Sequence, residues 1–163
     1  MRREDGSVLI EGARLIRRNF SGREELYNPL GKRNILVLLE DKLLVQDMIA
    51  DGWNVKTLKP REEGDEPGHA IKVTISFKAR PPKVVMITSK RRTELNADEI
   101  GMLDHVRFKL VDLIFVPYRW TMRDRPDESG VSAYLKTMYV TIDEDELELK
   151  YAEDIPEGQW DDE

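Results

Sequence analysis

Hydrophobic and polar positions along the chain follow mostly the pattern of β-strands. β-branched and aromatic residues gather in short runs that polar turns separate, which is typical of strands. The two longest runs flank TMRDRPDESG (121–130), a polar segment with Pro and Gly that predicts a hairpin. The runs predict strands over residues 8–20, interrupted at Gly12, and over 34–39, 53–58, 69–78, 83–88, 106–120 and 131–142.

Two segments have the features of short helices. Residues 41–51 place Leu44 and Met48 near one face, and the following glycine, Gly52, suits the end of a helix. Residues 97–105 follow Asn96, a good N-cap, with Glu99 three positions later in a capping-box-like pattern. The sequence therefore predicts one helix early in the chain and one between two late strands.

This order of elements predicts a fold class. Strand (83–88), helix (97–105), strand and strand is the order of the second half of an OB-fold barrel. We expect a mainly β (α+β) fold, an OB-fold-like antiparallel barrel with one or two short helices. Another α+β sheet is the alternative. The barrel would occupy residues 1–142, followed by an acidic tail over residues 143–163.

The charge is divided unevenly along the chain. The net charge is −6, from 26 Lys and Arg against 32 Asp and Glu. Residues 143–163 hold eleven acidic residues and one basic residue, so this tail carries −10. The body carries +4, and a mildly basic body suits a phosphate-rich partner.

The composition excludes several classes of protein. With no Cys, the chain has no disulfide, no thiolate metal site and no thiol nucleophile. The two histidines, His69 and His105, do not have metal-ligand spacing, and no glycine-rich phosphate loop is present. We expect no catalytic residue, no metal and no cofactor. No apolar run reaches the roughly 20 residues of a membrane span, so we expect a cytoplasmic protein without membrane contact.

Basic and aromatic residues are the candidates for binding. Cations meet phosphates and aromatic rings stack on bases, so their combination favours a nucleic-acid surface. Alternation along a strand places Tyr118 and Trp120 on one face, and Tyr134 and Lys136 on one face of the next strand. Burial in the core is the alternative for each aromatic ring. The candidates for phosphate contacts are Arg17, Arg18, Lys32, Arg33, Lys72 and Lys136, and those for base stacking are Phe20, Tyr118, Trp120 and Tyr134.

The tail has apolar residues scattered among its acids. A carboxylate-rich segment can occupy a basic groove in place of phosphates, or dock on a basic partner. A simple solubilising tail is the alternative. The candidate partner-binding residues are Asp154, Ile155, Pro156, Trp160, Asp161 and Asp162.

Several stretches resemble phage-encoded single-stranded DNA-binding proteins. They are RNFSG (18–22), NPLGKRN (28–34), DGWNVKTLKPREEGDEP (51–67), VDLIFVPYRW (111–120) and GVSAYLKTMYVTIDEDELELKYA (130–152). The resemblance implies an OB-fold core that binds single-stranded DNA in phage replication or recombination, without catalysis, in the cytoplasm of a bacterial host. It also implies an acidic tail that recruits replication or recombination proteins.

The tail departs from that family pattern, and alternatives stay open. Such tails often end in an aromatic or apolar residue, whereas this one ends in Trp160-Asp161-Asp162-Glu163. A homodimer is left open. The alternative function is a protein-interaction module whose acidic tail binds a basic partner, without DNA binding.

Overall fold

The computed structural model describes residues 1–60 and 62–144. In this part of the chain, no helix is long and apolar enough to cross a membrane. The elements, in chain order, are β1 (Val8–Ile10), β2 (Leu15–Asn19), β3 (Arg33–Leu39), α1 (Lys42–Ala50), β4 (Val55–Leu58), β5 (Gly68–Ile75), β6 (Lys83–Ile87), β7 (Arg92–Glu94), the 3-10 helix η1 (Ile100–Asp104), β8 (Phe108–Thr121) and β9 (Ser129–Ile142).

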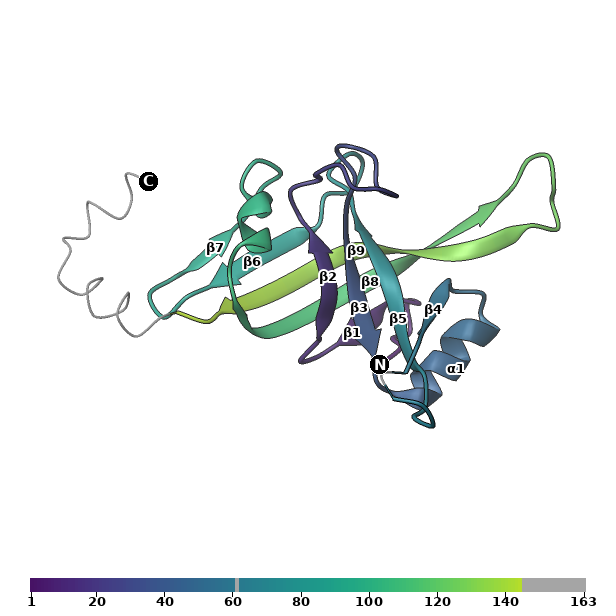
Figure 1. Cartoon of the computed structure of the whole chain (residues 1–163). Coiled ribbons are helices and arrows are strands. Elements are labelled where there is room, and N and C mark those ends of the chain that lie inside the picture. Colours follow the sequence, from purple (N-terminus) through teal and green to yellow (C-terminus); the bar gives the residue numbers. More distant parts are fainter. Residues whose placement is uncertain (61, 145–163) are drawn as a thin grey trace.

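Strands β1 and β2 belong to one run of chain that bends between the two ends of the sheet (Figure 1). The hydrogen-bonded order is β1-β8-β9-β5-β3-β2, so β1 and β2 form its two ends. In the link between them, the Ala13 N–H donates to the Val111 carbonyl of β8 at 2.7 Å. The Leu38 N–H of β3 donates to the Arg14 carbonyl at 2.9 Å. Because the link is bonded to both edges, β1 and β2 act as one bent first strand, and Gly12 at φ +61° lies at the bend.

Strand β9 changes partners along one of its edges. It pairs with β5 at Val73 and Thr74, and then with β6 from Lys83 onward, and both pairings are parallel. The expected mainly β, OB-fold-like barrel is confirmed, but these two pairings are not antiparallel. β5 and β6 lie one after the other along the same edge of β9, and both run parallel to it. Strand β7, which the sequence pattern did not predict, pairs with β6 in a hairpin that projects from the barrel (Figure 1).

The end of α1 turns the chain back into the core. Gly52 has φ +91°, a conformation that glycine adopts readily. The Gly52 and Trp53 N–H groups donate to the carbonyls of Ile49 and Met48 at 3.1 and 3.0 Å, which is a Schellman motif. Trp53 is buried and packs edge to face on Phe115, with ring centroids 5.6 Å apart. The predicted helix end at Gly52 is therefore confirmed.

The second predicted helix is a single short 3-10 turn, η1. The Asn96 side chain accepts from the Asp98 and Glu99 N–H groups at 2.9 and 3.0 Å, and the Glu99 carboxylate accepts from the Asn96 N–H at 3.3 Å. The reciprocal bonds of a capping box are present, although the turn that follows is too short for an α-helix. Ile100 and Leu103 are fully buried, so η1 covers one end of the barrel.

Asp104, the last residue of η1, anchors the loop over residues 21–32. Its carboxylate accepts hydrogen bonds from the Phe20 and Ser21 N–H groups at 2.7 and 3.0 Å, and from the Ser21 hydroxyl at 2.6 Å. The Arg23 guanidinium also donates to it at 3.0 Å. The Asp104 side chain is almost completely buried, and these donors satisfy its charge.

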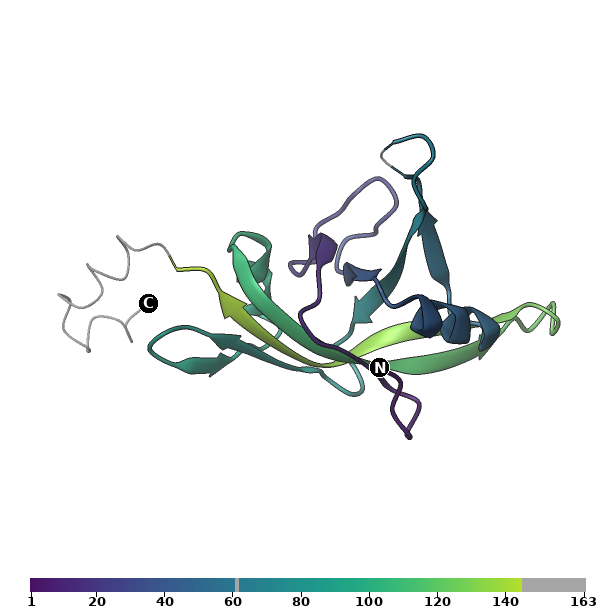
Figure 2. The same ribbon diagram turned by 90° about the horizontal axis from the view of Figure 1, so that it is seen from below.

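The β8–β9 hairpin extends beyond the barrel. Pairing continues to Thr121 and Ser129, and each strand has 14 residues. At about 3.4 Å per residue, each strand is roughly 45 Å long. Figure 2 shows the free end of the hairpin projecting past α1, on the opposite side of the molecule from the β6–β7 hairpin.

Candidate nucleic-acid interface

Strand register brings most of the predicted aromatic and basic residues to one outer face of the barrel. Residues paired across neighbouring strands point to the same side of a sheet. Tyr134 pairs with Thr74, which shares a face with Lys72 two positions earlier. Lys72 pairs with Leu36, and Leu36 pairs with Arg17. The outer face defined by these pairings, called the β8–β9–β5 face below, carries Arg17, Lys72, Ser132, Tyr134, Tyr118 and Trp120.

Three aromatic rings lie along this face. Tyr118 is 57% exposed, Trp120 is 37% exposed, and Tyr134 is half-buried. The rings of Tyr118 and Tyr134 meet edge to face, with centroids 5.6 Å apart and planes at 66°. Such a contact holds both rings in place while leaving ring surface in water, where a base can stack.

Trp120 lies directly over Gly130 on the paired strand. A Cβ atom on Gly130 would come within 2.7 Å of Cζ2 of the indole ring. Glycine is therefore required here for the close approach of the ring to the strand. The result is an indole held against the backbone of β9 beside the tyrosine pair.

Cations accompany the rings on the same face. Arg17 and Lys72 are exposed. Lys136 lies at the register shift of the β8–β9 pair and is also exposed, with its Nζ 3.9 Å from Oδ2 of Asp5. Lys56 is an addition that sequence reasoning missed, because only the β4–β5 register, Lys56 opposite Ala70, places it on the side of Lys72. Exposed cations beside aromatic rings suit a single nucleic-acid strand.

The structure corrects the prediction that Phe20 stacks on a base. Its ring is fully buried and packs edge to face on Phe108, with centroids 6.2 Å apart. A base cannot reach a ring in the core, so Phe20 is a core residue and not a stacking residue in this structure. Its N–H also bonds to Asp104, which fixes the chain at the start of the loop over residues 21–32.

The structure also corrects the prediction that Arg18 contacts a phosphate. It pairs with Ile35, so it lies on the inner side of β2, opposite to Arg17. Its guanidinium donates to the carbonyls of Leu103 and Val106 at 2.9 and 2.6 Å and lies 4.0 Å from the Phe108 ring centroid. These contacts hold the η1 region against β2, so Arg18 has a structural role rather than an exposed phosphate contact.

Lys32 and Arg33 lie away from the β8–β9–β5 face. Lys32 is exposed in the loop over residues 21–32. Arg33 is half-buried, donates to the Ala97 carbonyl at 3.2 Å and lies 5.5 Å from the Phe77 ring centroid. Its Nε is buried without a hydrogen-bond partner among the described residues. An unpaired buried N–H costs about 1–3 kcal/mol.

The loop over residues 21–32 presents a further exposed ring, Tyr27, which is 93% exposed. Asn28 holds the loop together, because its side-chain amide donates to the carbonyls of Arg23, Pro29 and Lys32. The Asn34 amide donates to the Asn28 side chain at 2.8 Å. The loop is therefore internally braced, although its aromatic residue faces water.

The base of the hairpin is fixed on the opposite side from Trp120. Arg119 donates to the Asp51 carboxylate at 3.0 Å, and Arg2 donates to the same carboxylate at 2.6 Å. The hydrogen bond from Arg119 and the positive charge of Arg2 lower the pKa of Asp51 below its ordinary value. The indole N–H of Trp53 donates to Asp51 as well, at 3.2 Å. Asp51 thus joins α1, the N-terminal segment and the hairpin.

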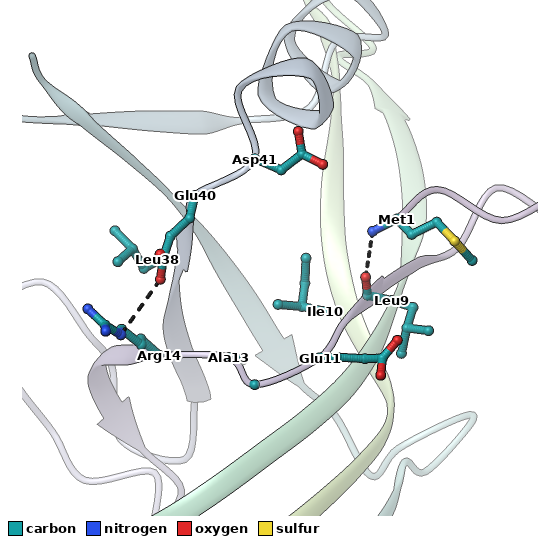
Figure 3. Close-up of a pocket in the computed structure, with 10 residues that line it drawn as sticks. Met1, Leu9, Ile10, Glu11, Ala13, Arg14, Leu38, Glu40 and Asp41 are labelled. Carbon is teal, nitrogen blue, oxygen red and sulfur yellow. Dashed lines mark hydrogen bonds and ion pairs between the residues drawn. The ribbon is translucent and has the colours of Figure 1, made fainter.

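One cavity lies away from this face, where β1 leads into β2 (Figure 3). It measures about 280 Å³. Glu11, Glu40 and Asp41 are among its lining residues, and Arg14 is paired with Glu40 at 3.7 Å. Carboxylates at this density repel phosphate, so the cavity does not suit nucleic acid. The described part of the chain has no cluster of three or more side chains that is suited to hold a metal ion.

The candidate residues of the tail lie outside the described residues. They are Asp154, Ile155, Pro156, Trp160, Asp161 and Asp162.

Solved structures with a similar fold come from a bacteriophage. The single-stranded DNA-binding protein from bacteriophage Enc34 in complex with ssDNA is 14% identical, with a TM-score of 0.56 over 87% of this chain and 89% of that chain. A C-terminal truncation of the Enc34 protein is also 14% identical, with a TM-score of 0.54 over 87% of each chain. At this identity the likeness supports the OB-like fold alone. No curated protein matches this chain.

A family model covers nearly the whole sequence. The family described as "Putative phage ssDNA-binding domain" matches residues 1–162. The match spans the barrel, the hairpin and almost all of the acidic tail, in agreement with the resemblance drawn from the sequence. The chain therefore belongs to the phage ssDNA-binding domain family.

Proposed function

We propose that this chain binds single-stranded DNA with little sequence preference, through base stacking and phosphate contacts on the β8–β9–β5 face. The observation that carries the proposal is the row of three rings, Tyr118, Trp120 and Tyr134, beside exposed cations on one face. Membership of the phage ssDNA-binding family supports it.

The mechanism divides the work between rings and cations. Every base has a π-face, so stacking tolerates any sequence and is worth about 1–3 kcal/mol per base. Lys72, Arg17 and Lys136 would meet phosphates, together with Lys56. Each phosphate contact on a single strand releases counterions and contributes roughly 0.7 to the slope of log affinity against log salt concentration.

A fluorescence titration with oligo-dT at several salt concentrations tests the proposal. We expect tight binding at low salt that weakens steeply as salt is added. The Lys72→Gln variant should bind more weakly and show a shallower slope, whereas Lys59→Gln, a matched change in the loop after β4, should behave like the wild type. No binding at low salt would reject the proposal.

We also propose that residues 1–142 form the binding domain and residues 143–163 an acidic tail that recruits replication or recombination proteins. The charge split supports this division, since the tail carries −10 and the body +4. Deletion of residues 143–163 should keep or raise the DNA affinity, because a competing negative segment is removed. Loss of DNA binding on deletion would contradict this role.

The face of rings and cations and the membership of the ssDNA-binding family favour a binding protein over an enzyme. A labelled oligonucleotide incubated with the protein and Mg²⁺ should be recovered uncut. Cleavage that depends on the protein would show a nuclease instead.

Sedimentation of the protein with and without DNA measures whether two copies associate, which tests whether the protein is a homodimer. Retention of a basic protein partner without any DNA binding would support the interaction-module alternative.

A further inference from the structure

The loop over residues 76–82 lies where β9 changes partners. Thr74 of β5 pairs with Tyr134, and Lys83 of β6 pairs with Thr137 three residues further along β9. The loop therefore leaves the barrel beside the interval between Tyr134 and Thr137. Lys136 lies within this interval and is exposed.

This loop forms one wall of a cavity of about 430 Å³. Its apolar lining comes from Phe77, Pro81, Pro82 and Leu95. Pro82 and Leu95 are buried, so packing holds these two side chains in place, whereas Phe77 is half-buried. A cavity of this size, with a mostly apolar lining and a few polar groups, is typical of small-molecule sites.

The polar groups of the cavity suit a nucleotide. Lys83 is exposed at its edge, and Asn96 and Glu94 complete the lining. The Asn96 side-chain oxygen is occupied by the N–H groups at the start of η1, which leaves the amide Nδ2 as a donor that no described residue uses. A base edge offers acceptors to such an amide, and a phosphate pairs with Lys83.

The surrounding charge has the sign that a nucleotide requires. Arg33 places its guanidinium carbon 5.5 Å from the Phe77 ring centroid. Lys78 and Arg80 lie in the loop itself and are exposed. Glu94 is the one acidic residue that lines the described cavity. An anionic ligand such as a DNA strand is therefore favoured over a basic or neutral peptide as its occupant.

Lys83, at the edge of the cavity, pairs with Thr137 of β9, the strand that also carries Tyr134. From Gly130, beneath Trp120, to Thr137, beside Lys83, there are seven steps of about 3.3 Å, so the row and the cavity span roughly 23 Å. We propose that the cavity beside Phe77 receives one base of a DNA strand that has crossed Trp120, Tyr118 and Tyr134, with Lys83 on its phosphate. This inference rests on the proposed function and extends its binding site.

Affinity measured against oligonucleotide length tests the inference. Oligo-dT that spans only the three rings should bind the wild type and the Lys83→Gln variant equally. Longer oligo-dT should gain affinity in the wild type by reaching the cavity. Phe77→Leu, which keeps an apolar side chain, and Lys83→Gln should lose this gain, a loss of roughly fivefold or more. Lys59→Gln is the matched control, and thermal unfolding checks that Phe77→Leu is folded.

The outcomes separate the two proposals. If both variants bind every length as the wild type does, the cavity takes no base and the inference is wrong, while the proposed function stands. An equal loss at every length would also contradict a separate site beyond Tyr134. If the wild type binds no length at low salt, the proposed function itself fails. Binding of a peptide in the cavity, with long and short oligonucleotides unaffected, would overturn the choice of a base.

Discussion

The rings of Tyr118 and Tyr134 meet edge to face across the β8–β9 pair, with centroids 5.6 Å apart and planes at 66°. Tyr118 pairs directly with Ser132, so the two rings are diagonal neighbours on one face of the sheet. Each ring limits the motion of the other, which lowers the entropy lost when a base stacks on them.

Replacing either tyrosine should weaken DNA binding more than it weakens the fold. Tyr118→Ala and Tyr134→Ala should each lose roughly fivefold to 100-fold in affinity for oligo-dT. Because the rings touch, the double variant should lose less than the product of the single losses. Fluorescence anisotropy measures the affinities, with Leu43→Ala on α1 as a control for removal of an exposed apolar side chain. Single variants with unchanged affinity would show that the pair does not stack on DNA.

Gly130→Ala should displace Trp120 without unfolding the protein. A new Cβ would lie 2.7 Å from the indole, and the ring is the part that can move. We expect a change in tryptophan emission and weaker binding of oligo-dT, with a thermal midpoint close to that of the wild type. Gly68→Ala, at the start of β5, is the control, because a Cβ there would make only an ordinary contact of 3.5 Å with Leu58. Unchanged emission and affinity in Gly130→Ala would contradict the close packing of Trp120.

Phe20→Ala should be a stability mutation. The ring is fully buried, and truncation of a buried phenylalanine costs about 3–5 kcal/mol. Urea unfolding measures the loss, and the fraction that stays folded should bind DNA with wild-type affinity. A stable Phe20→Ala protein with reduced DNA affinity would restore the stacking role that burial removes.

Asp51 should make stability depend on pH in the acidic range. Its pKa is lowered in the folded protein, mainly by the hydrogen bond from Arg119, so its contribution is fully present above its ordinary value of 3.8. As the pH falls below that value toward the lowered pKa, the unfolded chain takes up the proton first and the contribution is lost. Asp51→Asn should therefore have a lower thermal midpoint than the wild type at about pH 6. The difference between the two midpoints should shrink as the pH falls below 3.8, and a constant difference would exclude this cause.

The positions of most strands along the chain were predictable because the signals that mark them are local. Runs of β-branched residues mark β3, β5, β6, β8 and β9, and Gly52 marks the end of α1 through its backbone freedom. Strand β7 has only three residues, Arg92–Glu94, and too little pattern to detect. The parallel pairing of β5 and β6 with β9 depends on long-range contacts that periodicity does not encode.

The interface was predictable in part. Alternation correctly groups Tyr118 with Trp120, and it also separates Arg17 from Arg18 onto opposite faces. It does not say which face is inside, so the sequence predicts a phosphate contact for Arg18, whereas the structure shows its guanidinium donating to the carbonyls of Leu103 and Val106. Lys56 was missed because its place beside Lys72 depends on the register between β4 and β5.

Ultraviolet crosslinking of the full chain to oligo-dT, with the crosslinked peptides mapped by mass spectrometry, tests the central claim most directly. The proposed site predicts crosslinks in the peptides that carry Tyr118, Trp120 and Tyr134, and their loss as salt is raised. Crosslinks confined to α1 and the loop between β4 and β5 would contradict the claim that DNA lies on the β8–β9–β5 face.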